Sequence, residues 1–116
     1  MRPPSPPVVF AQDGTDVLAA LEAALATGSP ILVHVTATWC EVCQVQKPIV
    51  ASLLARPDFA GLTFFDVDFD TQRVTLRRLA VQTHATMIVF RDRTEVDRQV
   101  GQTDPEVIEA LVRKVI

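Results

Sequence analysis

Apolar residues recur along the chain with two different spacings, and the spacing predicts which segments are strands and which are helices. Short runs rich in β-branched and aromatic residues predict five strands, at residues 8–11, 31–36, 62–68, 86–90 and 95–100. Apolar residues three and four positions apart predict four helices, one ended by Gly28, one over 40–54, one over 71–79 and one over 105–115. The elements therefore follow the order β-α-β-α-β-α-β-β-α.

The ends of these helices carry recognisable residues. Asp13 or Thr15 is expected to cap the first helix, and Asp104 followed by Pro105 is expected to begin the last one. Pro48 lies inside the second predicted helix, where its missing N–H should produce a kink.

Connections between strands predict the fold class. Residues 31–36 are apolar almost throughout, the pattern of a central strand covered on both faces. Strands separated by helices pair in parallel, whereas the short link at residues 91–94 predicts an antiparallel hairpin. We therefore expect an α/β fold with a mixed five-stranded sheet flanked by four helices.

Composition and charge favour a soluble domain over a nucleic-acid-binding or membrane protein. A chain of 116 residues, 48% apolar and 22% charged, has the length and composition of one soluble domain. Its net charge of −3 is not the signature of a nucleic-acid or acidic-membrane binder. No apolar run approaches the length of a membrane span, so we expect no membrane partner and no nucleic acid.

The first residues differ in composition from the rest. Residues 2–7 contain four prolines, which predicts an extended N-terminal tail over 1–7 ahead of one domain over 8–116. The tail is either a frayed terminus or a ligand for an SH3-like groove. It lacks the apolar segment of a signal peptide, so we expect a cytoplasmic protein.

The motif Trp39-Cys40-Glu41-Val42-Cys43 stands where a predicted strand turns into a helix. Free N–H groups and the helix dipole stabilise an anion there, which favours the thiolate of Cys40. The second sulfur, one turn on, is placed to attack a mixed disulfide. Cys40 is therefore the candidate nucleophile and Cys43 the candidate resolving thiol, the alternative being two buried structural thiols.

Taken with its surroundings, this motif resembles the thioredoxin family. The likeness runs over residues 8–116 and is strongest over 31–48, where Pro48 follows the second cysteine by five residues. It implies a thioredoxin fold and a thiol–disulfide oxidoreductase that reduces protein disulfides. It also implies an electron donor of the thioredoxin-reductase type and no bound cofactor. The residues it places around the substrate are Trp39, as an exposed apolar platform, with Glu41, Val42, His84, Ala85, Thr86 and Gly101.

Glu41-Val42 stands where the family usually has Gly-Pro. A carboxylate beside Cys40 opposes formation of its thiolate. Our hypothesis is that Glu41 destabilises the thiolate and makes the couple more reducing.

His34 and Asp66 occupy the positions of an acid and a lysine in the family, so the pair is exchanged in sign. If their strands are neighbours, the two form a buried pair in which His34 takes the proton of Cys43 during its attack. The alternative is a core histidine with Asp66 turned to solvent.

His84-Ala85 replaces a segment in which the family carries a cis-proline. Because a cis bond to a residue other than proline costs roughly 3–4 kcal/mol, we expect a trans bond and a loop that deviates from the family. The family's loop binds the substrate backbone, and its proline shields the sulfurs from metal.

Two alternative functions follow from that loss. Cys40, Cys43 and His84, together with His34, are the chain's only thiols and imidazoles, and such ligands suit zinc or an iron–sulfur cluster. The other alternative is a thioredoxin-like protein-interaction module that binds its partner through the surface around Trp39.

Overall fold

The structure, a computed structural model, describes residues 8–10 and 16–116. The predicted tail over 1–7 and the predicted caps Asp13 and Thr15 lie outside these residues. The strands are β1 (Val8–Phe10), β2 (Ile31–Thr36), β3 (Thr63–Asp68), β4 (Thr86–Arg91) and β5 (Thr94–Val100). The helices are α1 (Leu18–Ala26), α2 (Glu41–Leu54), α3 (Arg73–Arg78) and α4 (Pro105–Arg113), with a 3-10 turn at Pro57–Phe59.

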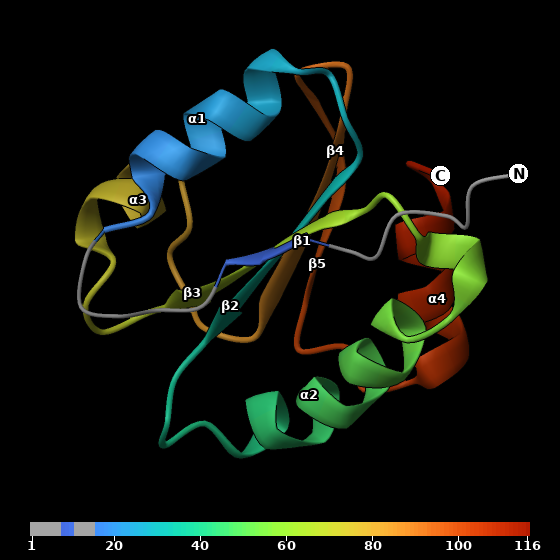
Figure 1. Cartoon of the computed structure of the whole chain (residues 1–116). Coiled ribbons are helices and arrows are strands. Elements are labelled where there is room, and N and C mark those ends of the chain that lie inside the picture. The colour runs from blue at the N-terminus through green and yellow to red at the C-terminus, as the bar shows by residue number, and fades with distance from the viewer. Residues whose placement is uncertain (1–7, 11–15) are drawn as a thin grey trace, which may run out of the picture.

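These strands form one mixed sheet in the order β1-β3-β2-β4-β5, drawn in Figure 1. β1 and β2 both pair with β3 in parallel, whereas β4 pairs with β2 and β5 antiparallel. Four strands have six or seven residues, and β1 adds three at the edge. Every residue of β2 is buried, which confirms the predicted central strand.

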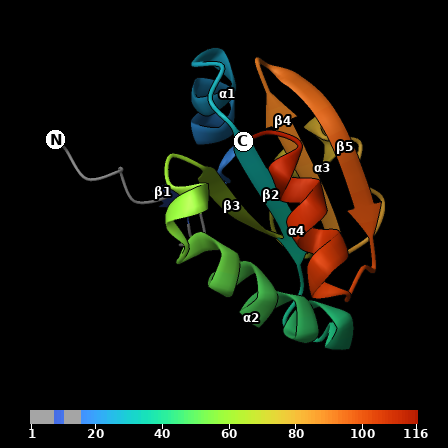
Figure 2. The same ribbon diagram turned by 90° about the vertical axis from the view of Figure 1, so that its right-hand side faces the viewer.

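Helices cover both faces of the sheet, α1 and α3 on one side and α2 and α4 on the other (Figures 1 and 2). Alternate residues of β2 therefore enter different clusters. Ile31 and Val33 pack with α1 and α3, whereas Leu32 packs with α2 and α4. By the same alternation His34 and Thr36 lie on the α2 side, which places polar side chains of the central strand beneath that helix.

Several predicted boundaries need correction. α1 begins at Leu18, whose N–H donates to Asp16 Oδ1 at 3.0 Å. α3 is shorter at both ends than 71–79. Thr71 is held in a turn before it by a hydroxyl bond to Asp68 at 2.8 Å, and Leu79 is the C-cap. The 3-10 turn, which buries Phe59, was not expected from the pattern. α2 continues through Pro48, as the prediction of a helix over 40–54 required, and the kink expected there stays a prediction.

The predicted hairpin between β4 and β5 is confirmed. Its two central residues, Asp92 and Arg93, have φ of +52° and +69°, the left-handed pattern that suits a two-residue hairpin loop. Asp104 caps α4 by accepting a bond from Glu106 N at 2.9 Å, as its position before Pro105 predicted. Among the described residues, no helix has both the length and the apolarity needed to cross a bilayer.

Candidate active site

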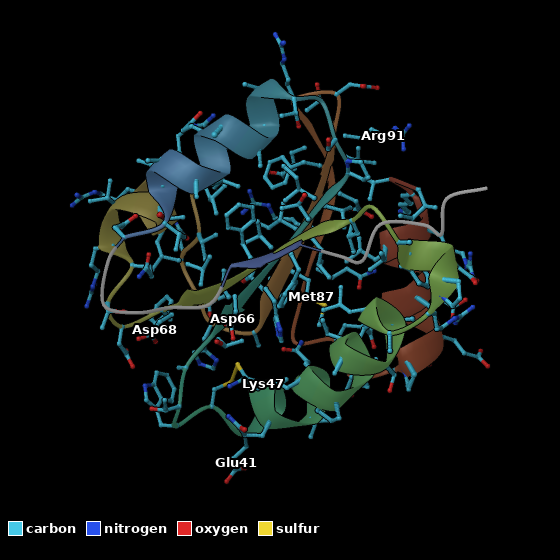
Figure 3. All side chains as sticks on the ribbon, in the orientation of Figure 1. Glu41, Lys47, Asp66, Asp68, Met87 and Arg91 are labelled. Carbon is cyan, nitrogen blue, oxygen red and sulfur yellow. A yellow bond between two sulfur atoms is a disulfide. The ribbon has the colours of Figure 1, made fainter. Side chains whose placement is uncertain are left out.

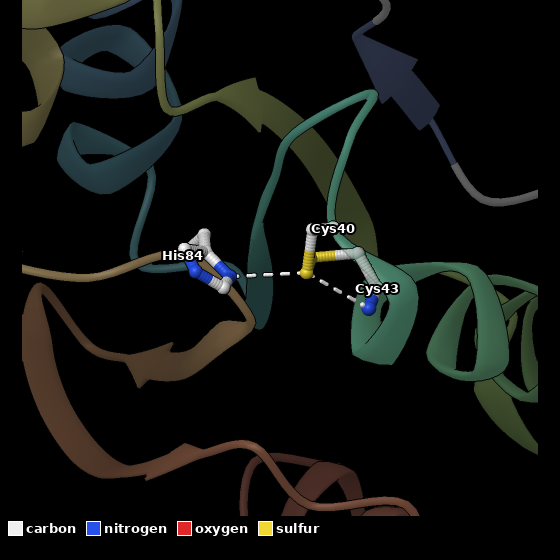
Figure 4. A group of neighbouring side chains, drawn as sticks. All are labelled: Cys40, Cys43 and His84. Carbon is white, nitrogen blue, oxygen red and sulfur yellow. Dashed lines mark hydrogen bonds between the residues drawn. A yellow bond between two sulfur atoms is a disulfide. The ribbon is translucent and has the colours of Figure 1, made fainter.

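Cys40 and Cys43 lie where the chain leaves β2 and enters α2. Cys40 is the N-cap of α2, and its Sγ accepts a hydrogen bond from Cys43 N at 3.1 Å. The two sulfurs form a disulfide whose Cα atoms are 5.3 Å apart (Figure 4). The strand-to-helix junction predicted for the motif is therefore confirmed.

Exposure differs sharply along the motif. Cys40 is 2% exposed and Cys43 is fully buried, whereas Trp39 is 57% exposed. The indole Nε1 of Trp39 donates to Asp70 Oδ2 at 2.7 Å, which fixes the ring at the surface. The exposed position predicted for Trp39 is confirmed, and its contact with substrate stays a prediction.

His84 and Ala85 form the other side of the site. Their peptide bond is trans, as expected, since the described residues contain no cis bond. Ala85 instead adopts φ of +60°, its N–H donates to Val35 O at 2.8 Å, and its carbonyl accepts from Gly101 N at 3.0 Å. The loop is thus anchored to β2 at one point and to the chain after β5 at another.

The ring of His84 lies over the disulfide. Its Nδ1 is 3.0 Å from Cys40 Sγ, the contact drawn in Figure 4. The ring meets Trp39 edge-on, with centroids 4.6 Å apart, and Phe69 at 6.0 Å. The substrate-binding position predicted for His84 is therefore in contact with the nucleophile's own sulfur.

Gln46 is a central residue of the site that sequence reasoning missed. It is fully buried, and its Nε2 donates to Ala85 O at 3.2 Å and Gln102 O at 2.9 Å. Because its amide nitrogen serves two carbonyls, its Oε1 accepts from His34 Nε2 at 2.8 Å, so His34 carries its proton on Nε2. A glutamine at a buried helical position, between Cys43 and Val50, was the available signal.

His34 and Asp66 are register partners on neighbouring strands, as the proposed pair required. His34 binds Gln46, whereas Asp66 Oδ1 accepts from Thr36 Oγ1 at 2.6 Å. Burial lowers the pKa of His34 from its ordinary value of 6.5, and the Gln46 bond and the charge of Asp66 oppose this. With Lys47, these two residues line a pocket of about 210 Å³ beside α2.

The remaining predicted binding residues are spread around the disulfide. Glu41 is exposed in the first turn of α2 and points away from the sheet (Figure 3), and Val42 is half-buried. Thr86 is buried, and its hydroxyl donates to Thr83 O at 2.9 Å. Gly101 is exposed with φ of +70°.

One group of metal-ligating atoms gathers at the site. Ligand atoms of Cys40, Cys43 and His84 lie within 4.8 Å of one another, and His34 stands outside this group. Structural zinc takes four protein ligands, so the described residues supply one too few. Both sulfurs are joined in the disulfide, which is the arrangement of a redox pair.

A dithiol at the N-terminus of a helix, on a mixed sheet covered on both faces, defines a thiol–disulfide oxidoreductase. The family model for thioredoxin matches residues 15–114. A thioredoxin of Mycolicibacterium smegmatis is 36% identical over 78 residues, 66% of this chain and 70% of that one. A thioredoxin of Chlamydia trachomatis is 30% identical, covering 72% of this chain and 80% of its own.

Solved structures agree with these matches. The crystal structure of Trxlp from Edwardsiella tarda is 37% identical, with a TM-score of 0.79 over 90% of this chain and 97% of that one. The chain belongs to the thioredoxin family.

Proposed function

We propose that the protein reduces disulfides in other proteins, with Cys40 as nucleophile and Cys43 as resolving thiol. The observation that carries this assignment is the placement of Cys40 as N-cap of α2, with its sulfur accepting a backbone N–H. Free N–H groups at a helix N-terminus stabilise a thiolate, so Cys40 is the better attacking group of the two.

The reaction proceeds in two exchanges. The Cys40 thiolate attacks one sulfur of the substrate disulfide, forms a mixed disulfide and releases the other substrate sulfur as a thiolate. Cys43 then loses its proton and attacks Cys40 Sγ, which releases the second substrate sulfur and leaves the Cys40–Cys43 disulfide. Two electrons from an external reductase, of the thioredoxin-reductase type, restore the dithiol.

His34 is the base we assign to Cys43. Burial lowers its pKa, so the ring is neutral at pH 7, and with the proton on Nε2 its Nδ1 is the basic atom. Asp66, its register partner, provides a negative charge that stabilises the ring once it is protonated. If His34→Ala resolved the mixed disulfide at the wild-type rate at every pH, this role would be excluded.

Substrate contacts are assigned to the exposed surface around the disulfide. Trp39 supplies apolar area, and the exposed Glu41 and Gly101 and the half-buried Val42 are the further contacts that we assign. Ala85 is 3% exposed, and its N–H and its carbonyl are already bonded within the protein, so its backbone does not pair with a substrate.

We assign the protein to a reducing compartment, the cytosol. Both cysteines of the chain lie in the redox pair, so the fold depends on no structural disulfide. The pair is then kept reduced by the cell and runs in the direction of substrate reduction.

The test combines trapping with a redox titration. Cys43→Ser should accumulate a mixed disulfide with a protein substrate such as insulin, whereas Cys40→Ser should accumulate none. In dithiothreitol and glutathione buffers, alkylation and mass spectrometry should show one reversible two-electron transition. Failure of Cys43→Ser to trap would contradict the proposal. Thiols that oxidise only after a chelator is added would contradict it and favour metal binding.

A further inference from the structure

We propose that His84 is a catalytic residue, whose Nδ1–H donates a hydrogen bond to Cys40 Sγ and stabilises the thiolate of the reduced protein. The inference deepens the dithiol chemistry proposed above and rests on it. His84 stands where the resemblance predicts only a substrate contact.

The first observation is the contact itself. Nδ1 of His84 lies 3.0 Å from Cys40 Sγ. A disulfide sulfur carries no proton, so the ring nitrogen must be the donor in this bond. When the disulfide is reduced, the same N–H already points at the atom on which negative charge develops.

Burial gives the contact its importance. Cys40 is 2% exposed, so water contributes little to solvating a thiolate at this position. A buried anion must be stabilised by donors from the protein. Two described groups point at the sulfur, Cys43 N at 3.1 Å and His84 Nδ1 at 3.0 Å, and only the imidazole is a side-chain donor that a substitution can remove.

The imidazole is held in place from two directions. Trp39 and Phe69 meet it edge-on, with centroids 4.6 Å and 6.0 Å away. The next residue, Ala85, is fixed by its bonds to Val35 O and Gly101 N. A donor fixed in advance need not reorganise when the sulfur becomes charged.

A carboxylate near the site acts against the thiolate. Glu41 lies beside Cys40 on α2, and Asp70, after β3, binds the indole that touches the ring of His84. The negative charge of Glu41 opposes a thiolate on Cys40. The hydrogen bond from His84 Nδ1 to Cys40 Sγ therefore offsets part of that repulsion.

The test measures the thiolate of Cys40 directly. In the reduced full-length protein, with a chelator present, the rate of Cys40 alkylation by iodoacetamide is followed against pH by mass spectrometry. His84→Phe keeps an aromatic ring between Trp39 and Phe69 but has no donor. We expect it to raise the pH midpoint by about one unit, a roughly tenfold loss of thiolate below that midpoint.

A conservative variant separates the bond from packing. His84→Asn places an amide N–H close to the position of Nδ1 and should restore part of the lost thiolate. Gln82→Ala, an exposed change in the same loop, should match the wild type. A wild-type pH midpoint in His84→Phe, or an Asn variant no better than Phe, overturns the proposal.

The redox potential provides a second readout. A stabilised thiolate stabilises the dithiol, so a tenfold loss in His84→Phe should lower the potential by about 30 mV. Both measurements need no substrate. If the wild-type protein fails to reduce insulin, the proposed function fails, while the pH midpoint and the redox potential still test His84. If the wild type reduces insulin but His84→Phe has an unchanged potential, only the proposal for His84 fails.

Discussion

At the scale of single residues, the sulfur of Cys40 is subject to opposing influences. The N-terminus of α2 and the N–H of Cys43 favour its thiolate. Glu41, one residue on, adds a negative charge that opposes it. The reactivity of the pair therefore depends on neighbours within one turn of α2 as well as on His84, whose Nδ1 lies 3.0 Å from the sulfur.

Glu41→Gln removes the opposing charge. We expect the pH midpoint for alkylation of Cys40 to fall by a few tenths of a unit, because the carboxylate is exposed and well screened. The shift should shrink between 0.05 and 0.5 M salt, roughly the range over which the screening length drops below 5 Å. A midpoint that rises instead would contradict the hypothesis that Glu41 destabilises the thiolate.

Local pattern was sufficient to predict part of this site. Cys40, Cys43 and the trans bond before Ala85 follow from spacing and peptide energetics, which involve adjacent residues only. The contact of His84 with Cys40 joins residues 44 positions apart and depends on the left-handed conformation of Ala85. An alanine gives no sequence signal for that conformation, because such backbone usually belongs to glycine.

At the scale of elements, Gln46 ties α2 to two other parts of the molecule. Its side chain reaches His34 on β2 and the carbonyls of Ala85 and Gln102, on either side of the β4–β5 hairpin. One amide therefore sets the tautomer of the proposed base and fixes the loop that carries His84.

Gln46→Leu keeps the volume of the side chain and removes its polar atoms. The change leaves buried groups unpaired, each costing about 1–3 kcal/mol, so we expect a loss of roughly 3 kcal/mol in the free energy of unfolding. Urea unfolding of the oxidised protein measures it.

A double-mutant cycle tests the hydrogen bond between Gln46 and His34. Combining Gln46→Leu with His34→Leu should cost less than the sum of the two single changes, by about 1–2 kcal/mol, because the second change removes a group that the first had orphaned. Strict additivity would show that this hydrogen bond does not couple β2 to α2.

The turn between β4 and β5 is strained in a way that substitution can relieve. Arg93 has φ of +69°, a conformation that costs a residue with a side chain roughly 1–2 kcal/mol. Arg93→Gly should therefore be more stable than Arg93→Ala by about 1 kcal/mol after allowance for the flexibility of glycine in the unfolded chain. The alanine variant controls for the lost bond from Arg93 to Ala26 O.

Element order was predictable because helix and strand spacings are strong over long segments. The 3-10 turn at 57–59 was not, since it is one short turn held by burial of Phe59. The start of α3 depends on the side-chain bond between Thr71 and Asp68, which spacing does not reveal.

At the scale of the whole molecule, the buried imidazole of His34 links stability to pH. Burial lowers its pKa in the folded protein below the value of 6.5 that it has when unfolded. Below pH 6.5 the unfolded chain therefore takes up a proton that the folded chain does not, and the free energy of unfolding falls. Four carboxylates also have lowered pKa values, and they change the free energy of unfolding only at more acidic pH. They are Asp16, Asp58, Asp97 and Glu109.

Unfolding in urea between pH 7.5 and 5.5 tests this linkage. The wild type should lose up to about 1 kcal/mol on the acid side of pH 6.5, since one proton changes stability by 1.36 kcal/mol per pH unit. His34→Leu should show a flatter dependence over the same interval, whatever its absolute stability. An equal slope in both proteins would assign the pH dependence to other groups.

Ala85 also bears on how this lineage can change over generations. Proline holds φ near −65° and has no N–H, whereas Ala85 needs φ of +60° and donates to Val35 O. A mutation of Ala85 to the proline typical of the family would therefore meet a wrong backbone angle and a lost hydrogen bond at once. Glycine accepts the angle and keeps the N–H, so of these two substitutions this position is open to glycine and closed to proline.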